Sequence, residues 1–308
     1  MKKTFAKLLL QLLDEQDKSQ NKTYFIVGDL GYAAFEEIRE KHQMNFINAG
    51  VSEQNMIGVA SGFSVLGNEV FVYSIIPFLL YRTFEQIRND ICYHNLPVRL
   101  IGAGAGLAYS EAGSTHHPLE DLKVADALPN ITILSPSDPK EVEIFMRKMK
   151  TIQGPVYMRL GKNNEPILHK SHDEIKIGKA LKLAEGNEIL IVSTGVVTKV
   201  ALEVADILNQ EMPKSTEVLE IHTFKPFDEE ALLSSSEGKK LIVTIEDNTG
   251  ALSEKVKSAI AFTGEKDSLA FKFPDEFTHS AGTREYLFDK YGINTKNIYN
   301  KIKEVLNE

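Results

Sequence analysis

Short apolar runs rich in β-branched residues alternate with amphipathic helical stretches along the first half of this chain. Such an alternation is typical of a mostly parallel sheet that helices cover on both faces. The strands are predicted at 23–28, 45–49, 69–75, 98–103, 131–135 and 155–160, and the helices at 3–16, 53–66, 80–94 and 139–150. At the start of the last helix, Asp138 can act as the cap and Pro139 takes the first helical position.

The alternation restarts after a polar segment at roughly 161–187. Further strands are predicted at 188–195, 216–224, 239–247 and 269–273, with helices at 197–210 and 295–307. A length of 308 residues also favours two domains of ordinary size. We therefore predict an α/β protein with two domains, 1–165 and 187–308, joined by a linker at 166–186. Each domain is expected to be a mostly parallel sheet covered by helices.

Charge and composition exclude several classes of protein. A net charge of −8 argues against a nucleic-acid binder, because no basic face is available to neutralise phosphates. Cys92 is the only cysteine, which excludes a disulfide framework and a thiolate metal cluster. No run approaches the roughly 18 apolar residues that a membrane span needs. The amphipathic first stretch lacks a signal-peptide cleavage site, so a soluble, cytoplasmic protein without a membrane partner is expected.

Glu53 is a carboxylate within an otherwise apolar run, NAGVSEQNMIGVA (48–60), just where a strand gives way to a helix. A carboxylate in such a place is often functional. The alternative is a plain acidic residue at a helix start, stabilised by the helix dipole.

Three further segments combine polar or aromatic side chains with strand ends. The glycine-rich run at 102–121 lets a ligand approach the backbone and ends in His116 and His117, which point in different directions and make poor joint metal ligands. An aromatic run at 73–90 could form a cofactor platform, although this spacing is also typical of a core. Arg159 and Lys162 follow a predicted strand and suit a phosphate or carboxylate contact, or else a solvated surface.

Taken together and in this order, these segments resemble the C-terminal half of the transketolase family, which comprises a pyrimidine-binding domain and a transketolase C-terminal domain. SEQNM at 52–56 resembles the segment with the family's catalytic glutamate, which places Glu53 in that role. GSTHHP at 113–118 resembles the family's G-x-T-H segment, with His116 as the substrate-facing histidine. GPVYMRLGK at 154–162 resembles its GP…R strand end. The likeness covers nearly the whole chain and is strongest toward stand-alone C-terminal subunits of split transketolases.

The resemblance implies thiamine diphosphate (ThDP) as the cofactor of a two-chain enzyme. Mg²⁺ and the diphosphate would be held mainly by a partner, an N-terminal transketolase subunit with a GDG…N domain for which this chain has no room. A heterotetramer with two copies of each chain, in which this chain also pairs with itself, is the expected assembly. Gly28, Asp29 and Leu30 with Asn55 nearly match that GDG…N spacing, but the third glycine is missing, so we reject this match.

Five residues are implied to bind the cofactor. Glu53 would hydrogen-bond the aminopyrimidine ring and so help to activate the cofactor for catalysis. Phe78 would stack on that ring, although Leu79 or Tyr81 could take its place. Arg82 belongs to the same segment. Asp29 would approach the cofactor from a second wall of the site. This chain itself is expected to hold no metal ligands.

The implied reaction transfers a two-carbon ketol unit from a ketose or ketose phosphate to an aldose. His116 would bind the donor and act in catalysis, with His117 beside it, while Arg159 and Lys162 would touch the distal end of the sugar. Ala112 stands where the family usually has Asp. Lys162 stands where the family usually has Arg, and a lysine cannot form the bidentate pair of hydrogen bonds that an arginine makes. These departures, and a plain Gly102–Gly106 run in place of phosphate-binding side chains, favour an unusual, deoxy or amino, sugar.

Two other interpretations stay open at this point. The same two-domain plan occurs in the β subunit of 2-oxo acid dehydrogenases and in deoxyxylulose-phosphate-synthase-like enzymes. A non-catalytic subunit that only assembles with a partner is the third possibility, although Glu53 and His116 are both present.

Overall fold

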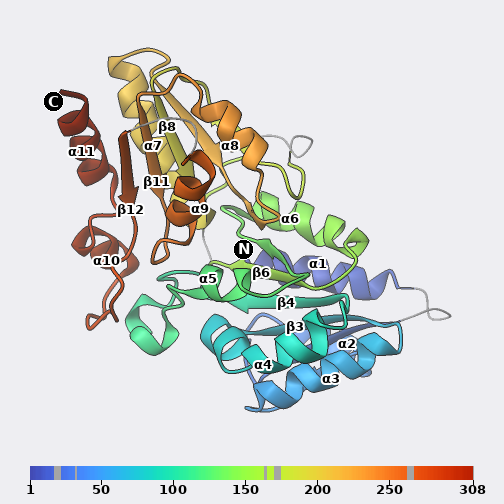
Figure 1. Cartoon of the computed structure of the whole chain (residues 1–308). Helices are drawn as coiled ribbons and strands as arrows, with labels where there is room; N and C mark the ends of the chain where they lie inside the picture. The colour runs from blue at the N-terminus through green and yellow to red at the C-terminus, as the bar shows by residue number, and fades with distance from the viewer. Residues whose placement is uncertain (17–21, 32, 163–164, 170–174, 262–266, 308) are drawn as a thin grey trace.

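The computed structural model describes the chain except for residues 17–21, 32, 163–164, 170–174, 262–266 and 308. Residues 170–174 belong to the predicted linker, so that part of the prediction lies outside the described residues. Figure 1 shows two sheets in separate halves of the molecule, each flanked by helices. Both sheets are mostly parallel, which confirms the predicted α/β class. Among the described residues, no helix is long and apolar enough to span a membrane.

The first sheet has seven strands in the order β10-β5-β6-β4-β3-β1-β2. Its strands are β1 (Thr23–Val27), β2 (Phe46–Asn48), β3 (Glu69–Ile75), β4 (Val98–Ala103), β5 (Thr132–Leu134), β6 (Val156–Leu160) and β10 (Thr223–Lys225). Side chains alternate between the two faces, so Val70 and Val72 join one apolar cluster while Phe71 and Tyr73 join the other. Both faces are buried, as expected of a parallel sheet.

Helices cover both faces of this sheet. One face is covered by α1 (Lys2–Asp14), α2 (Glu36–Lys41) and α6 (Pro139–Lys148), and the other by α3 (Glu53–Val65) and α5 (Asp121–Asp126). The α1 helix buries Phe5, Leu9, Leu12 and Leu13 because these positions share one side of the helix. As predicted, Asp138 caps α6, where its side chain accepts from the backbone N–H of Glu141 at 2.9 Å.

The second sheet has five strands in the order β12-β11-β8-β9-β7. Its strands are β7 (Leu181–Ala184), β8 (Ile189–Ser193), β9 (Thr216–Glu220), β11 (Leu241–Ile245) and β12 (Asp267–Phe271). The helices of this half are α7 (Thr198–Glu211), α8 (Glu229–Ser236), α9 (Ala251–Ile260), α10 (Arg284–Lys290) and α11 (Thr295–Asn307). Side chains of α8 and α9 pack on one face of the sheet, and those of α7, α10 and α11 on the other.

Two predicted elements are wrong in detail. The strand predicted at 216–224 is two strands, because the chain leaves β9 at Glu220 and pairs again as β10, antiparallel to β5 of the first sheet. The helix predicted at 80–94 is a helical segment from Pro77 to Cys92 that is interrupted at Arg82 and Thr83, in which two π-helical segments, Pro77–Tyr81 and Ile87–Cys92, flank the short helix α4 (Phe84–Gln86). Such widened turns often occur at functional sites.

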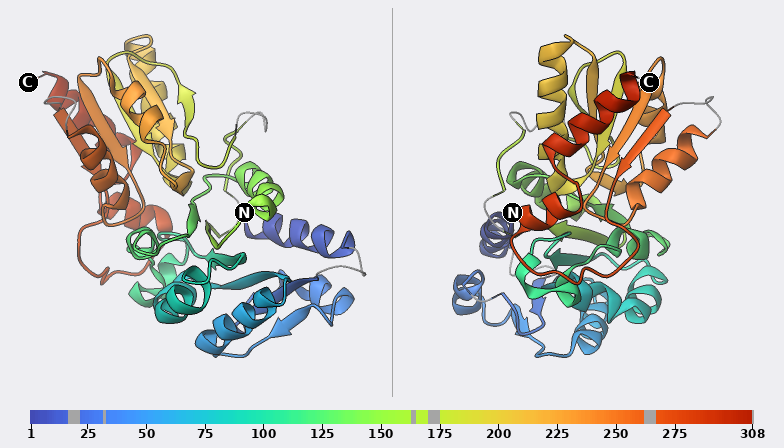
Figure 2. Two further views of the ribbon diagram at one scale, coloured as in Figure 1. Left: turned by 45° about the vertical axis from the view of Figure 1, so that its right-hand side comes forward. Right: turned by 90° about the vertical axis from the view of Figure 1, so that its left-hand side faces the viewer.

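The two halves meet through a shared core rather than through a thin linker. One apolar cluster includes Ile26 and Val72 of the first sheet together with Leu190 and Val192 of the second. The backbone N–H of Ser135, just after β5, donates to the carbonyl of His222 at 2.8 Å. The views in Figure 2 show the C-terminal half packed directly on the N-terminal half.

Candidate functional site

The topology gathers the predicted site segments at one edge of the first sheet. Because β1 to β4 and β6 are parallel, their carboxyl ends lie at the same edge. Asp29 follows β1, Glu53 follows β2, Phe78 follows β3 and His116 lies in the long connection after β4. The fold therefore places residues that are far apart along the chain at one edge of the sheet, which is the edge where ligands bind in such sheets.

Glu53 occupies the first position of α3, and only 2% of it is exposed. Its Oε2 accepts from Nη1 of Arg82 at 2.6 Å. Gly28 passes so close that a Cβ at that position would lie 3.4 Å from Cγ of Glu53. The start of α3 also favours a negative charge. A buried carboxylate is thus held in one orientation by a helix start and a guanidinium.

The segment after β3 places Arg82 beside the ring of Phe78, with the guanidinium carbon 4.6 Å from the ring centroid. Phe78 is half-buried, whereas Leu79 is fully buried in the core. The hydroxyl of Tyr81 donates to Oε2 of Glu120 at 3.0 Å, and burial raises the pKa of Tyr81 above its usual range. Phe78 is consequently the ring of this segment that lies beside the Glu53–Arg82 pair.

His116 also contacts Phe78. Its ring meets the Phe78 ring edge to face, with the centroids 5.3 Å apart. Its Nδ1 lies 2.9 Å from Oγ1 of Thr115, and the side chain is half-buried. Glu53, Arg82, Phe78 and His116 therefore form one continuous row of contacts, and we call these four residues the Glu53 row.

His117 does not share this place. It is 4% exposed, its Nδ1 lies 2.6 Å from Oγ1 of Thr278, and its Nε2 lies 3.2 Å from the carbonyl oxygen of Ser110. Burial lowers the pKa of His117 from its ordinary value. The prediction that His117 binds substrate is not supported, because both of its ring nitrogens face protein groups.

Arg159 also differs from its predicted role. Only 1% of it is exposed, Nε donates to Oδ2 of Asp121 at 2.9 Å, and Nη1 donates to Oδ1 of Asp247 at 2.8 Å. Both carboxylates are fully buried. We correct the prediction accordingly: Arg159 joins the two halves, because Asp121 belongs to the first and Asp247 to the second.

Sequence reasoning missed both carboxylates: Asp121 ends the glycine-rich run at 102–121 but was not singled out, and Asp247 lies in no recognisable motif. The hydroxyl of Tyr157 and the amide of Asn248 also donate to Asp121, at 2.7 and 2.9 Å. Lys162, in contrast, is exposed, with Nζ 5.8 Å from the ring centroid of Tyr109. Of the two basic residues predicted to meet the sugar, Lys162 is therefore the one with access to solvent.

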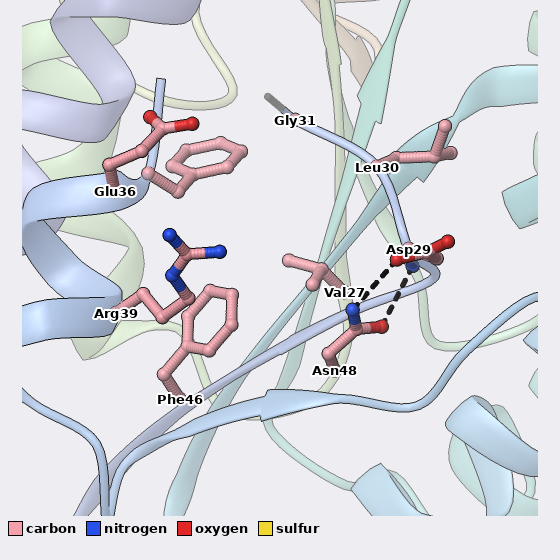
Figure 3. Close-up of a pocket in the computed structure, with 9 residues that line it drawn as sticks. Val27, Asp29, Leu30, Gly31, Glu36, Arg39, Phe46 and Asn48 are labelled. Atoms are coloured by element: carbon pink, nitrogen blue, oxygen red, sulfur yellow. Dashed lines mark hydrogen bonds between the residues drawn. The ribbon is translucent and has the colours of Figure 1, made fainter. Parts of the chain in front are cut away.

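Asp29 lies in a tight turn beside a small cavity of about 80 Å³ (Figure 3). Its backbone is left-handed, with φ of 54°. Asn48, rather than Asn55, is its partner: Oδ1 of Asn48 accepts from the Asp29 N–H at 3.1 Å, and Nδ2 donates to Oδ1 of Asp29 at 2.8 Å. Cofactor pockets usually enclose about 300–1,000 Å³, so this cavity alone does not surround a cofactor.

Two family descriptions match this chain and together cover most of it. Residues 2–166 match "Transketolase, pyrimidine binding domain", and residues 178–298 match "Transketolase, C-terminal domain". Fold and site define a protein with the two-domain plan of the C-terminal half of transketolases. The chain belongs to the transketolase family.

Relatives with curated names include proteins described as a section or a subunit of a transketolase. A protein of Methanocaldococcus jannaschii, provisionally described as a transketolase C-terminal section, is 35% identical over 84% of this chain and 82% of its own length. The 6-deoxy-6-sulfo-D-fructose transketolase subunit SqwH of Clostridium sp. (strain MSTE9) is 30% identical over 99% of this chain and 94% of its own length. The 1-deoxy-D-xylulose-5-phosphate synthase of Clostridium perfringens is 30% identical over 98% of this chain and 49% of its own length.

Solved structures agree with these relatives. A split gene transketolase, described as an inactive beta4 tetramer, superposes with a TM-score of 0.84 at 30% identity, covering 99% of this chain and 97% of that one. A transketolase of Pichia stipitis superposes with a TM-score of 0.79 at 16% identity, covering 98% of this chain and 45% of that one. At that identity the second match shows the fold alone.

Proposed function

We propose that this chain is the pyrimidine-binding subunit of a two-chain, ThDP-dependent transketolase, which transfers a two-carbon ketol unit from a ketose to an aldose. The observation that carries the proposal is the Glu53 row. It joins a buried carboxylate, a guanidinium, an aromatic ring and a histidine at the carboxyl edge of a parallel sheet. The predicted cofactor residues Glu53, Phe78 and Arg82 and the predicted substrate residue His116 are thus neighbours.

The residues present fit the aminopyrimidine end of ThDP. A buried carboxylate can hydrogen-bond a ring nitrogen, and a half-buried aromatic ring nearby can stack on a flat heterocycle. When bound, ThDP supplies the nucleophilic carbon and the electron sink for breaking a carbon–carbon bond. Glu53 would hold a proton at the pyrimidine nitrogen, Arg82 would orient the Glu53 carboxylate, and His116 would hydrogen-bond the oxygens of the donor sugar.

A partner chain would supply the rest of the site, namely the Mg²⁺ and the diphosphate-binding groups. Two observations support this part of the proposal. The cavity at Asp29 is far too small for the cofactor. Exposed residues also surround the buried Glu53: Val51 is 76% exposed, and Gln54 and Asn55 are exposed as well. Asp29 would approach the cofactor from this chain, and Lys162 would reach the distal end of the substrate.

The test combines this chain with a subunit that carries the GDG…N domain, together with ThDP and Mg²⁺. Ketol transfer is followed as the appearance of a ketose that is two carbons longer than the acceptor aldose. Glu53→Gln should abolish turnover while the circular dichroism spectrum and the elution of the assembled complex stay unchanged. Glu85→Gln, at an exposed position of the neighbouring segment, should behave as wild type. Near-normal turnover of Glu53→Gln would refute the proposed role.

The same assembly separates the alternatives. Decarboxylation of a 2-oxo acid without ketol transfer would identify a dehydrogenase-type subunit, and condensation of pyruvate with an aldose phosphate would identify a deoxyxylulose-phosphate-synthase-like enzyme. If the assembly catalysed none of these reactions and bound no cofactor, this chain would be a non-catalytic subunit. The related subunits act, by their names, on 6-deoxy-6-sulfo-D-fructose and apulose-4-phosphate. Uncommon ketoses of this kind are the donors we propose to assay first.

A further inference from the structure

A second polar cluster lies between the two halves, in a part of the protein that the proposed reaction does not use. It contains His169 of the predicted linker, Glu141 of α6 and Glu220 at the end of β9, and all three are buried. Nε2 of His169 lies 2.8 Å from Oε2 of Glu220 and 3.9 Å from Oε1 of Glu141. One ring nitrogen and two carboxylates from three separate segments therefore face a common point.

The other ring nitrogen has a carboxylate of its own. Nδ1 of His169 lies 3.0 Å from Oδ2 of Asp138, and that oxygen also accepts the backbone N–H groups of Leu168 and His169. A histidine that binds a metal usually presents its second ring nitrogen to a carboxylate, which fixes the ring orientation. With Nε2 as ligand, the ring proton would reside on Nδ1, which lies 3.0 Å from Oδ2 of Asp138 but is not aligned for a hydrogen bond to any described residue.

Two buried oxygens of this cluster have no hydrogen-bond partner among the described residues: Oε1 of Glu141 and Oε1 of Glu220. The other oxygen of Glu141 accepts from the backbone N–H of Ser137 at 2.6 Å, so the unpaired Oε1 is the one nearest to Nε2 of His169. A buried carboxylate oxygen without a donor is costly unless a proton or a cation is bound to it. Both oxygens are therefore available to bind a cation.

The balance of charge agrees with this view. Three carboxylates, those of Asp138, Glu141 and Glu220, face a single histidine. In the described part of the chain, no Lys or Arg forms an ion pair with any of the three. The Arg159 cluster is different, because there a guanidinium neutralises its carboxylates. A divalent cation would supply the missing positive charge.

We propose that Glu141, His169 and Glu220 bind a divalent first-row metal ion of the zinc type, with Asp138 holding the imidazole in place. The ligand atoms all lie within 4.8 Å of one another, and ligands on one zinc ion lie roughly 3–3.5 Å apart, given bonds of about 2.0–2.2 Å. Small side-chain rotations therefore suffice. One imidazole and two carboxylates suit Zn²⁺ or Mn²⁺ better than Mg²⁺ or Ca²⁺, which prefer oxygen alone.

The role of this ion is structural. All three ligands are buried, and closed sites of this kind contribute to folding rather than to chemistry. The ion would tie α6 of the first half, the linker residue His169 and β9 of the second half into one unit. A second oxygen of either glutamate, or a water molecule, would complete the coordination.

The alternative is a metal-free arrangement. Burial by itself would lower the pKa of His169, but the neighbouring carboxylates of Asp138 and Glu220 raise it to about 11, so a metal-free His169 would be an imidazolium paired with them. Metal content separates the two states, because the imidazolium form holds no ion.

The experiment measures the metal content of the full chain, produced with Zn²⁺, Mn²⁺ or Co²⁺ in the medium and then passed through a chelating column. We expect one ion per chain by mass spectrometry, and with Co²⁺ the visible absorption bands of a bound ion. Glu220→Gln and His169→Gln should lower the content at least tenfold. His94→Gln, at an exposed histidine, should keep the wild-type content.

Two results would overturn the proposal: wild-type protein without stoichiometric metal under all three conditions, or variants of Glu220 and His169 that retain the full content. The wild-type measurement decides the question even if a variant fails to fold. Unfolding of the wild type with and without a chelator gives a second measurement, and the unfolding temperature should fall when the ion is removed.

Discussion

Nη1 of Arg82 donates to Oε2 of Glu53 across 2.6 Å, although the Arg82 side chain is 44% exposed and that of Glu53 is 2% exposed. The pair thus reaches from the surface into the interior. The same guanidinium lies over the ring of Phe78. Arg82 is therefore a positioning residue, because it orients the proposed acid and contacts the ring proposed to stack on the cofactor.

Arg82→Met should lower kcat of the assembled enzyme by roughly 10- to 100-fold, because a charge-assisted hydrogen bond contributes about 1.5–3 kcal/mol. Methionine keeps much of the length and the apolar contact with Phe78 but cannot donate to Glu53. Steady-state kinetics with the partner subunit, ThDP and Mg²⁺ would measure the change. Arg88→Met, at an exposed residue of the same segment, serves as the control. Equal kcat for both variants would contradict the positioning role.

Asn48→Ala should weaken binding of the cofactor more than it weakens the fold. The Asn48 amide holds Asp29 through two hydrogen bonds and also accepts from the backbone N–H of Gly50 at 2.9 Å. Asn48 is exposed, so little stability should be lost. We expect the ThDP concentration for half-maximal rate to rise about tenfold, as for the loss of about 1.4 kcal/mol.

For Asn48→Ala, the thermal midpoint should remain near that of the wild type. Asn55→Ala is the informative comparison, since Asn55 is the residue of the rejected GDG…N match, whereas Asn48 is the residue that hydrogen-bonds Asp29. A larger rise in half-saturation for Asn55→Ala than for Asn48→Ala would reverse this assignment.

Gly106→Ala should destabilise the protein strongly. Gly106 has φ of +54°, and a Cβ there would overlap Oδ2 of Asp247, the buried partner of Arg159. Left-handed backbone costs a residue with a Cβ roughly 1–2 kcal/mol, and breaking a buried ion pair costs about 3–5 kcal/mol. Urea unfolding should show a loss of at least about 3 kcal/mol.

Gly62→Ala is the matched control for that substitution. Gly62 lies in α3, and a Cβ there would meet no atom within 4 Å. Since alanine is the better helix former, Gly62→Ala should raise stability by about 0.5–1 kcal/mol. If the two variants unfolded at the same urea concentration, the contact between Gly106 and Asp247 would not matter as we infer.

Acidic pH should destabilise the protein through His117. Burial lowers the pKa of His117 below its ordinary value of 6.5, so the unfolded chain binds a proton at a pH where the folded chain does not. The stability that the neutral His117 contributes is present above pH 6.5 and is lost as the pH falls toward the folded pKa. Ser110 and Thr278 face the ring nitrogens, and His116 adds a further repulsion when it is protonated.

The free energy of unfolding, measured between pH 7 and 5, should therefore decrease less for His117→Asn than for the wild type. His94→Asn should keep the wild-type slope, because His94 is exposed. An unchanged slope for His117→Asn would show that other groups dominate the acid response.

Periodicity predicted most strands of the fold because buried parallel strands are short apolar runs between helices. It failed at 216–224, where hydrophobic character continues although the chain passes from one sheet to the other at Ile221 and His222. At 80–94 it predicted a helix but not its interruption near Thr83, whose hydroxyl donates to the carbonyl of Leu79, nor the π-helical segments on either side. Neither feature changes the pattern of apolar residues.

The candidate site was predictable where a residue type stood out from its surroundings. Glu53 is a carboxylate in an apolar run, and the Phe78–Arg82 segment follows a strand, so both could be found in the sequence. Arg159 and His117 could not be placed, because their burial depends on Asp247 and Thr278, which lie far along the chain. The charge on Arg159 suggested solvent, whereas its partners make it an interior residue.

Strand β10 has a consequence for how such proteins can be recombined. Residues 223–225 come from the second half of the chain but complete the edge of the first sheet beside β5. A chimera that takes its second half from a relative must therefore import a segment that still pairs with Ile133 and Leu134. Without it, β5 would become an open edge, and open edges invite pairing between chains and aggregation. The two halves therefore cannot be exchanged independently, because residues 223–225 of the second half complete the sheet of the first half.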